Sequence, residues 1–224
     1  MPIIHHPAET APLEAELLAR WRVIPASVAA DIAPECLVDP DLRPLCPPGE
    51  QPALIGRALT LRCAVPDFGA VLAAMDLVQA GDVLVIDAGG DGSHAMIGDI
   101  LCAHLVARGV AGVVCNGAVR DVAEIRRMTG LSVYARSINP RGPFGASEGT
   151  IGLPVSVAGL MIRTGDLILG DDDGLVALPP DRLASLLPGC EDKLHKESRW
   201  RARLAAGEMA ADVFGLAPLI PPQG

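Results

Sequence analysis

Between residues 58 and 136, short apolar runs alternate with segments of helical periodicity, and this alternation constrains the fold more than any other feature of the chain. The apolar runs end at glycine or polar turns, which is typical of strands. The expected strands span residues 58–65, 83–86, 110–115 and 132–136, and the expected helices span residues 68–77, 97–108 and 122–128. Gly109 suits the left-handed residue that ends the second helix. The pattern predicts an α/β core.

The pattern changes on the C-terminal side of this core, where glycine or aspartate turns separate shorter apolar runs. These runs predict short strands at residues 153–157, 160–163, 167–169 and 175–178. Pro180-Asp181 restarts a helix, and a charged helical segment is expected from about residue 191 to 209. Its charge pattern is compatible with a solvated face or with packing on another subunit.

The N-terminal side contains less periodic structure. Residues 1–12 are expected to form an irregular arm, and residues 38–50 hold four prolines, which indicates a loop. Between them, residues 13–22 predict a short amphipathic helix, and Ser27 is a plausible N-cap of a second helix that ends near residue 32. The chain therefore divides into an N-terminal arm with helices (1–50), a single α/β core (51–180) and a C-terminal helical tail (181–224).

Composition argues against two classes of partner. Aromatic residues are 3% of the chain and the net charge is −9, whereas nucleic-acid binding relies on stacking rings and basic residues. No apolar run approaches the roughly 20 residues that span a bilayer, so no membrane partner is expected. The six cysteines form no C-x-x-C pair, and the N-terminus lacks a signal-type segment, which favours reduced thiols in the cytoplasm.

Lysine is nearly absent, since only Lys193 and Lys196 occur, both in the charged stretch near the C-terminus. Schiff-base chemistry requires a lysine that is desolvated in a pocket, and these two are expected to be solvated. Carbonyl chemistry in this chain would therefore need a metal ion.

The segment from Asn116 to Asp121 is the strongest candidate for a functional site. An apolar strand over 110–115 is expected to end in a glycine turn that presents Arg120 and Asp121 side by side. Arginine offers a planar fork for a carboxylate, and aspartate offers hard oxygen ligands to a divalent cation. The pair indicates a site for an anionic, metal-chelating substrate such as a 2-oxo acid. The alternative is a surface ion pair in which Asp121 caps the helix that starts at Val122.

The glycine-rich segment Gly90–Ala95 matches the loose G-x-G-x-x-A dinucleotide pattern, which makes an NAD-binding enzyme a weaker possibility. The following strand ends without the acidic residue that this fingerprint predicts about 20 positions on. The helix expected after this turn can present the amides of Ile100 and Leu101 to an anion. Asp99, in its first turn, serves either in that site or simply as an acid that stabilises the helix N-terminus.

Several of these segments together resemble one family. They are, in chain order, Gly81–Asp87, Gly98-Asp99, Gly109–Gly112, Gly117–Asp121, Pro140–Pro143, Pro154-Val155 and Gly165-Asp166 through Gly174. The chain is similar over roughly residues 25–180 to the family that unites 4-hydroxy-4-methyl-2-oxoglutarate aldolases with regulators of ribonuclease E activity. The resemblance implies a β/β/α sandwich, swivelling-domain-like, assembled into ring-shaped trimers that often stack as hexamers. The segment 66–69 departs from the family pattern, which bears on substrate range.

For the aldolase branch, which the long tail favours, the resemblance implies a metal-dependent aldolase. It would cleave a 4-hydroxy-2-oxo acid to pyruvate and a second oxo acid, and would also decarboxylate oxaloacetate. Asp121 would hold Mg²⁺ or Mn²⁺, and Arg120 with the Gly98–Leu101 segment (Gly98, Ile100 and Leu101) would bind the substrate. Asp99 and a tail Glu from an adjacent chain would handle the proton; Glu197 matches best, with Glu191 and Glu208 nearby. The rival is a non-catalytic regulator on the same fold.

Overall fold

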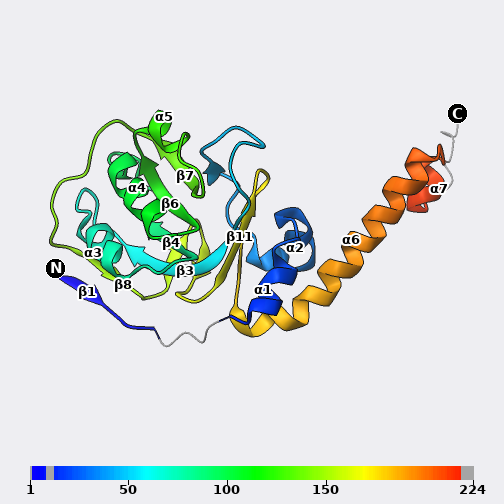
Figure 1. Ribbon diagram of the computed structural model, residues 1–224, viewed down its shortest axis with the longest axis horizontal. Coiled ribbons are helices and arrows are strands. Elements are labelled where there is room, and N and C mark those ends of the chain that lie inside the picture. The colour runs from blue at the N-terminus through cyan, green and yellow to red at the C-terminus, as the bar shows by residue number, and fades with distance from the viewer. Residues whose placement is uncertain (1, 9–12, 218–224) are drawn as a thin grey trace, which may run out of the picture.

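Four parallel strands form the centre of the fold in the computed structural model, which describes residues 2–8 and 13–217 (Figure 1). They are β3 (Leu54–Arg62), β4 (Asp82–Asp87), β6 (Gly112–Val119) and β7 (Ser132–Ile138). Three helices follow these strands: α3 (Gly69–Leu77), α4 (Asp99–Ala107) and α5 (Val122–Ile125). The predicted α/β alternation is confirmed, and Gly109 has the expected positive φ of 72°.

The two faces of this sheet are covered by different layers. Successive side chains of a strand point to opposite faces, and in β4 Leu84 and Ile86 belong to the cluster that includes α3 and α4. Val83 and Val85 belong instead to a cluster with the C-terminal strands. These are β9 (Val155–Val157), β10 (Leu160–Ile162), β11 (Leu167–Asp171) and β12 (Gly174–Leu178). The core therefore has the expected β/β/α layering.

Several short strands extend the sheet where sequence patterns predict none. They are β1 (Ile3–His5), β2 (Arg43–Pro44) and β5 (Ala95–Ile97), and a fourth piece, β8 (Gly149–Ile151), precedes the strand expected at 153–157. β8 pairs with β3 and β1 pairs with β8, so part of the expected irregular arm is ordered by sheet pairing. Likewise β2 pairs with β7, inside the proline-rich loop. Strands of two or three residues are too short to show a period, which is why the sequence did not reveal them.

The N-terminal helices pack on the outer side of β11 and β12, in a cluster that also includes Ile55 of β3. They are α1 (Ala15–Trp21) and α2 (Ala26–Ile32), followed by the short η1 (Pro34–Cys36). Buried Trp21 contributes to their shared cluster. Ser27 is not the N-cap of α2, because the helix already begins at Ala26. The Asp171 carboxylate on the β11–β12 hairpin accepts the Ala26 N–H at 2.8 Å, so a distant residue supplies the cap.

After η2 (Pro180–Arg182), the tail forms one long helix, α6 (Leu183–Ala205), and a short one, α7 (Ala210–Phe214). α6 starts earlier and ends earlier than the expected 191–209. Its 23 residues correspond to about 34 Å of length. Figure 1 shows its second half running away from the core, with α7 folded back at the far end. Among the described residues, no helix has the length and apolar character that crossing a membrane requires.

Candidate functional site

The strand that delivers Arg120 and Asp121 is longer than expected. β6 shifts its register against β7 between Cys115 and Ala118 and then continues to Val119, so residues 116–119 form strand rather than a turn. Gly117 is needed here, because a Cβ would lie 2.7 Å from the Ala88 Cβ. The Arg-Asp pair is thus placed at the end of a strand paired on both sides by β5 and β7.

The backbone then turns sharply at Asp121, which has left-handed angles (φ 58°, ψ 38°). Aspartate tolerates this conformation better than most residues, although it is still uncommon outside glycine. Asp121 occupies the N-cap position of α5, but its side chain makes no capping hydrogen bond. The carboxylate instead points back to the start of α4, where Oδ2 lies 3.4 Å from the Asp99 N–H and 3.3 Å from Arg120 Nε. The capping alternative therefore does not describe this side chain.

Two glycines allow this close approach. A Cβ at Gly98 would lie 3.0 Å from Arg120 Cγ and would overlap Asp121 Oδ2. A Cβ at Gly142 would lie 3.3 Å from Arg120 Cζ and would overlap its terminal nitrogen. The guanidinium thus packs between two backbone segments that have no side chain at the contact. This restricts its direction while its side chain stays 39% exposed.

A cavity of about 230 Å³ opens beside this pair. It is lined by Phe68, Met96, Ile97, Gly98, Asp99, Ile100, Leu101, Arg120 and Pro143. The structure therefore places Gly98, Asp99, Ile100, Leu101 and Arg120 around one space, with Asp121 in contact with two of them. Their roles stay predictions. The volume lies below the roughly 300–1,000 Å³ of sites for drug-sized ligands, which favours a small metabolite.

One detail of the expected anion site needs correction. The Ile100 N–H is not free, because it donates to Asp99 Oδ1 at 2.8 Å. Asp99 is the first residue of α4, so it also stabilises the helix N-terminus, which was the alternative role expected for it.

Cys102 lies one turn further along α4. Burial raises the pKa of its thiol to about 12, and the nearby carboxylates of Asp99 and Asp121 act in the same direction. Cys102 is therefore a thiol, not a nucleophile.

The dinucleotide interpretation of Gly90–Ala95 is wrong in its structural premise. This segment leads into β5, and α4 begins only at Asp99, so the glycine turn does not open a helix. The Gly90 N–H donates to the Asn116 carbonyl, and the Ser93 N–H donates to Asp91 Oδ1. The amides that would cradle a pyrophosphate are thus used within the fold.

The carboxylates of Asp99 and Asp121 suit one kind of metal ion. Among the described residues, no three His, Cys, Asp or Glu side chains gather closely enough to form a closed metal cage. Mg²⁺ and similar hard cations keep several waters and are often bound by one or two carboxylates plus substrate oxygens. The Asp121 carboxylate, 37% exposed and within 3.4 Å of the Asp99 amide nitrogen, suits that mode and does not suit a four-ligand zinc site.

The tail glutamate lies apart from this cavity within the chain. Glu197 is on the second half of α6, where it pairs with Lys193 at 3.4 Å and with Arg201 at 3.0 Å. Glu191 pairs with Arg20 at the base of α6, and Glu208 pairs with Arg203 near its end. A role for any of them in a neighbouring copy's site stays a prediction.

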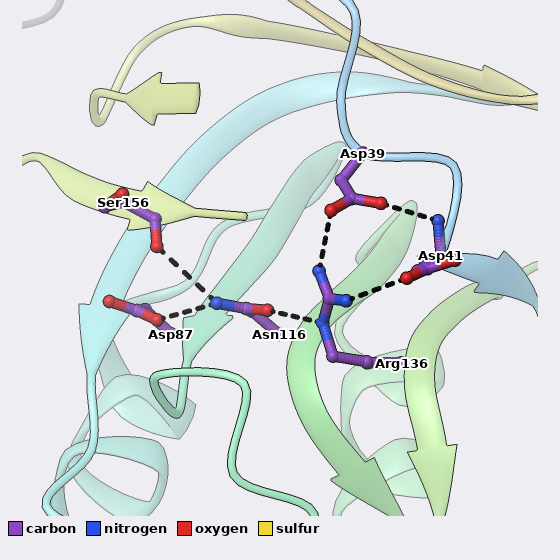
Figure 2. Close-up of polar contacts among 6 residues, drawn as sticks. All are labelled: Asp39, Asp41, Asp87, Asn116, Arg136 and Ser156. Carbon is purple, nitrogen blue, oxygen red and sulfur yellow. Dashed lines mark hydrogen bonds and ion pairs between the residues drawn. The ribbon is translucent and has the colours of Figure 1, made fainter. Parts of the chain in front are cut away.

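A second, larger cavity of about 650 Å³ was not foreseen from the sequence. Its walls include polar residues at the carboxyl-end side of the four parallel strands: Arg62, Asp87, Asn116 and Arg136. Figure 2 shows the network, in which buried Asn116 donates to Asp87 Oδ1 at 3.0 Å and accepts from Arg136 Nε at 3.1 Å. Arg136 also pairs with Asp39 and Asp41. The signal for this cavity in the sequence was that each of the four strands carries one polar residue near its carboxyl end.

The two cavities are separate among the described residues, since no residue lines both. The Asp87–Asn116–Arg136 network ties β4, β6 and β7 to the loop that carries Asp39 and Asp41. Asp87 and Asn116 are only 6% and 3% exposed, so each of these hydrogen bonds satisfies a buried polar group. The network therefore links the carboxyl-end halves of three neighbouring strands, one of which, β6, delivers Arg120.

Comparison with known proteins agrees with this architecture. The family model described as RraA-like, Aldolase/RraA, matches residues 30–177. A protein of Halalkalibacterium halodurans named "Putative 4-hydroxy-4-methyl-2-oxoglutarate aldolase" is 32% identical over 191 residues, covering 84% of this chain and 89% of its own. A 4-hydroxy-4-methyl-2-oxoglutarate aldolase of Thermus thermophilus is 33% identical over 150 residues, covering 62% and 90%. The crystal structure of Streptomyces coelicolor RraAS2, described as an unusual member of the RNase ES inhibitor RraA protein family, superposes with a TM-score of 0.76 at 26% identity, covering 86% and 100%.

Proposed function

Because this chain belongs to the RraA-like family of aldolases and RraA proteins, we propose that it is a divalent-metal-dependent lyase. The proposed reaction cleaves a 4-hydroxy-2-oxo acid, such as 4-hydroxy-4-methyl-2-oxoglutarate, to pyruvate and a second carbonyl compound. The observation that carries this proposal is that Arg120 and Asp99 line one small cavity while the Asp121 carboxylate contacts both residues beside it. Gly98 and Gly142 make this close approach possible.

In the proposed reaction each residue of the site has a separate role. Arg120 holds the substrate carboxylate through its planar fork. The C3–C4 bond breaks, the 4-hydroxyl loses its proton, and the bonding electron pair remains on the pyruvate fragment as an enolate that is then protonated at C3. Asp99, with Glu197 of a neighbouring copy, accepts the hydroxyl proton through a water. Mg²⁺ or Mn²⁺ held by Asp121 would supply Lewis-acid stabilisation of the charge that develops on the 2-oxo oxygen.

The same enolate arises when oxaloacetate loses its β-carboxylate as CO₂, so oxaloacetate decarboxylation is proposed as a second activity. The proposed assembly is a ring-shaped trimer or a hexamer in the cytoplasm. Exposed apolar residues on and beside α7, among them Met209, Phe214 and Leu216, support packing of the tail on another copy. The proposed proton transfer needs that packing to place Glu197 near a neighbouring cavity.

The deciding experiment measures pyruvate release by a coupled lactate dehydrogenase assay, with oxaloacetate and 4-hydroxy-4-methyl-2-oxoglutarate as substrates. Release should require Mg²⁺ or Mn²⁺, stop with EDTA and return when metal is added in excess. Reactions without protein correct for decarboxylation catalysed by the metal alone. The variant Asp121→Asn tests the proposed metal ligand, and Asp76→Asn, at an exposed position on α3, is its matched control.

The rival function is non-catalytic regulation of an RNase E-like partner, which the likeness to RraAS2 favours. This function needs the surface of the fold but gives no reason for Arg120 and Asp99 to line a cavity with Asp121 in contact with both. If no metal-dependent pyruvate appears above the no-protein background with either substrate, the regulator becomes the better assignment.

A further inference from the structure

One row of polar side chains crosses the sheet at the carboxyl ends of its four parallel strands. Arg62 of β3 is the register partner of Asp87 in β4, and Asp87 is the partner of Asn116 in β6. Arg136 of β7 completes the row, since its Nε donates to Asn116 Oδ1. Val85 faces the C-terminal strands, so Asp87, two residues later, faces the same way. These four residues line the second cavity, of about 650 Å³, at the edge where open α/β sheets bind ligands.

Two members of the row are already used within the fold. Asn116 donates to Asp87 Oδ1 and accepts from Arg136 Nε. The terminal nitrogens of Arg136 pair with Asp39 at 3.2 Å and with Asp41 at 3.4 Å. Asn116 and Arg136 therefore keep the row in place rather than supplying free groups to a ligand.

Arg62 and Asp87, at the other end of the row, still have bonding capacity. Asp87 is only 6% exposed, and its Oδ1 accepts the Gly89 N–H at 2.8 Å and the Asn116 amide at 3.0 Å. Its Oδ2 accepts no hydrogen bond from the described residues, and Figure 2 shows this oxygen directed away from Asn116. Arg62 is exposed, and within the described part of the chain its guanidinium has no hydrogen bond or ion pair, including with Asp87.

A ligand that carries both an acid group and an ammonium group matches these two positions. An unpaired guanidinium binds a carboxylate through its planar fork. A mostly buried carboxylate oxygen without a donor is costly, and an ammonium supplies both the N–H and the opposite charge. The row and its ion pairs hold the carboxylates of Asp39, Asp41 and Asp87 against the guanidiniums of Arg62 and Arg136. A simple anion would add to this excess of negative charge, whereas a zwitterion adds none.

The opposite wall of the cavity suits an apolar side chain. It is formed by the β9–β10 hairpin and the residue before it, and it includes Pro154, Val155 and Met161. Met161 is 48% exposed, which is high for a large apolar residue in a strand. Asn116 Nδ2 lies 3.5 Å from the Ser156 carbonyl, so the hairpin is joined to the polar row across the cavity.

We propose that this cavity binds a free α-amino acid with an apolar side chain. Its carboxylate binds Arg62, its ammonium binds Asp87 Oδ2, and its side chain packs on the wall that contains Met161. Both charged groups of an α-amino acid are on one carbon, which fits two partners on adjacent strands about 4.8 Å apart. The site does not depend on the proposed reaction, since no described residue lines both cavities.

The test is isothermal titration calorimetry of the full chain with L-leucine, L-methionine and L-phenylalanine, and with two analogues of leucine. Isocaproate lacks the ammonium of leucine, and isopentylamine lacks its carboxylate, so the three compounds share one side chain. We expect leucine to bind at least about tenfold more tightly than either analogue, because each analogue loses one charged hydrogen-bonded contact. A saturating concentration of leucine should also raise Tm.

Variants assign the binding to this cavity. Arg62→Gln should weaken leucine binding by about tenfold or more. It should leave isopentylamine binding within about twofold, because only the partner of the carboxylate is lost. Arg163→Gln is the matched control, at an exposed arginine that lines neither cavity, and should bind leucine like the wild type. Arg120→Gln changes the first cavity and should also keep leucine binding.

Three results would overturn the inference. The first is no heat and no change in Tm with any of the three amino acids at millimolar concentration. The second is isocaproate binding as tightly as leucine, which would make the site one for simple carboxylates. The third is leucine binding that Arg62→Gln leaves intact or that Arg120→Gln removes, which would place the ligand elsewhere. None of these results bears on metal-dependent pyruvate release, so the proposed function is tested separately.

Discussion

Replacing Gly98 with alanine tests whether the close approach of Arg120 and Asp121 matters for activity. The backbone at Gly98 is extended (φ −142°, ψ −168°), so alanine adopts it without strain. The added Cβ, however, would lie 3.0 Å from Arg120 Cγ and 3.1 Å from its Nε, and it would overlap Asp121 Oδ2. Either the Arg-Asp pair or the start of α4 must move.

The expected effects on stability and activity differ in size. Gly98 is the N-cap of α4, where alanine is less favourable, so we expect a loss of about 1 kcal/mol and a Tm lower by about 2–4 °C. The pair itself is more than a third exposed and adds little to this figure. Displacing catalytic groups by about 1 Å can cost on the order of 10²-fold in rate, and this is the loss we expect in turnover.

Pyruvate methyl exchange in D₂O, measured across a Mg²⁺ titration, reports on the site directly. Gly189→Ala is the matched control, because its Cβ would lie 3.4 Å from Ile32, an ordinary contact, inside α6. It should keep the wild-type exchange rate and gain up to about 1 kcal/mol of stability. A Gly98→Ala protein that is folded and exchanges at the wild-type rate with wild-type Mg²⁺ dependence would refute the packing argument.

Three further predictions follow from named contacts. Arg120→Lys should lower kcat/KM for pyruvate release by about 10²-fold with little change in Tm, because a point charge cannot replace the fork; near-normal turnover would remove Arg120 from the mechanism. Asn116→Leu removes a donor from buried Asp87 and an acceptor from Arg136, and urea unfolding should show a loss of about 2–4 kcal/mol. Burial raises the pKa of Asp67, but the N–H donors of Ser147, Gly69 and Glu148 outweigh burial and hold it below its usual value. Ionised Asp67 thus stabilises the fold above its unfolded pKa of about 3.9, so Asp67→Asn should lower Tm at pH 7, and the difference should shrink as pH falls below that value.

The central strands were predictable because each buries a run of apolar residues long enough to be recognised. Their helices were predictable for the same reason, down to the glycine cap at Gly109. The short strands β1, β2 and β5 were not, because partners far away in the chain stabilise them. The cap of α2 was missed likewise, since Asp171 supplies it from a hairpin about 145 residues later.

The candidate site, too, could be predicted from the sequence only in part. That Arg120 and Asp121 are neighbours, and that a Gly-Asp pair precedes them by one unit, is a matter of chain order. That the Asp121 carboxylate turns toward Gly98 rather than capping α5 depends on a left-handed residue at the end of a bulged strand. The Asp87–Asn116–Arg136 network was missed because its members come from three strands and meet only when the sheet forms.

Chain order and local composition therefore determined the layers of the core, the functional groups available to the site and the family resemblance. Apolar periodicity and adjacent functional groups are local properties of a sequence. Tertiary structure alone decided which backbone amides already donate hydrogen bonds within the fold, which residues surround the Arg120 guanidinium and where Glu197 lies. Those outcomes depend on steric contacts and hydrogen bonds between segments that are distant in the chain.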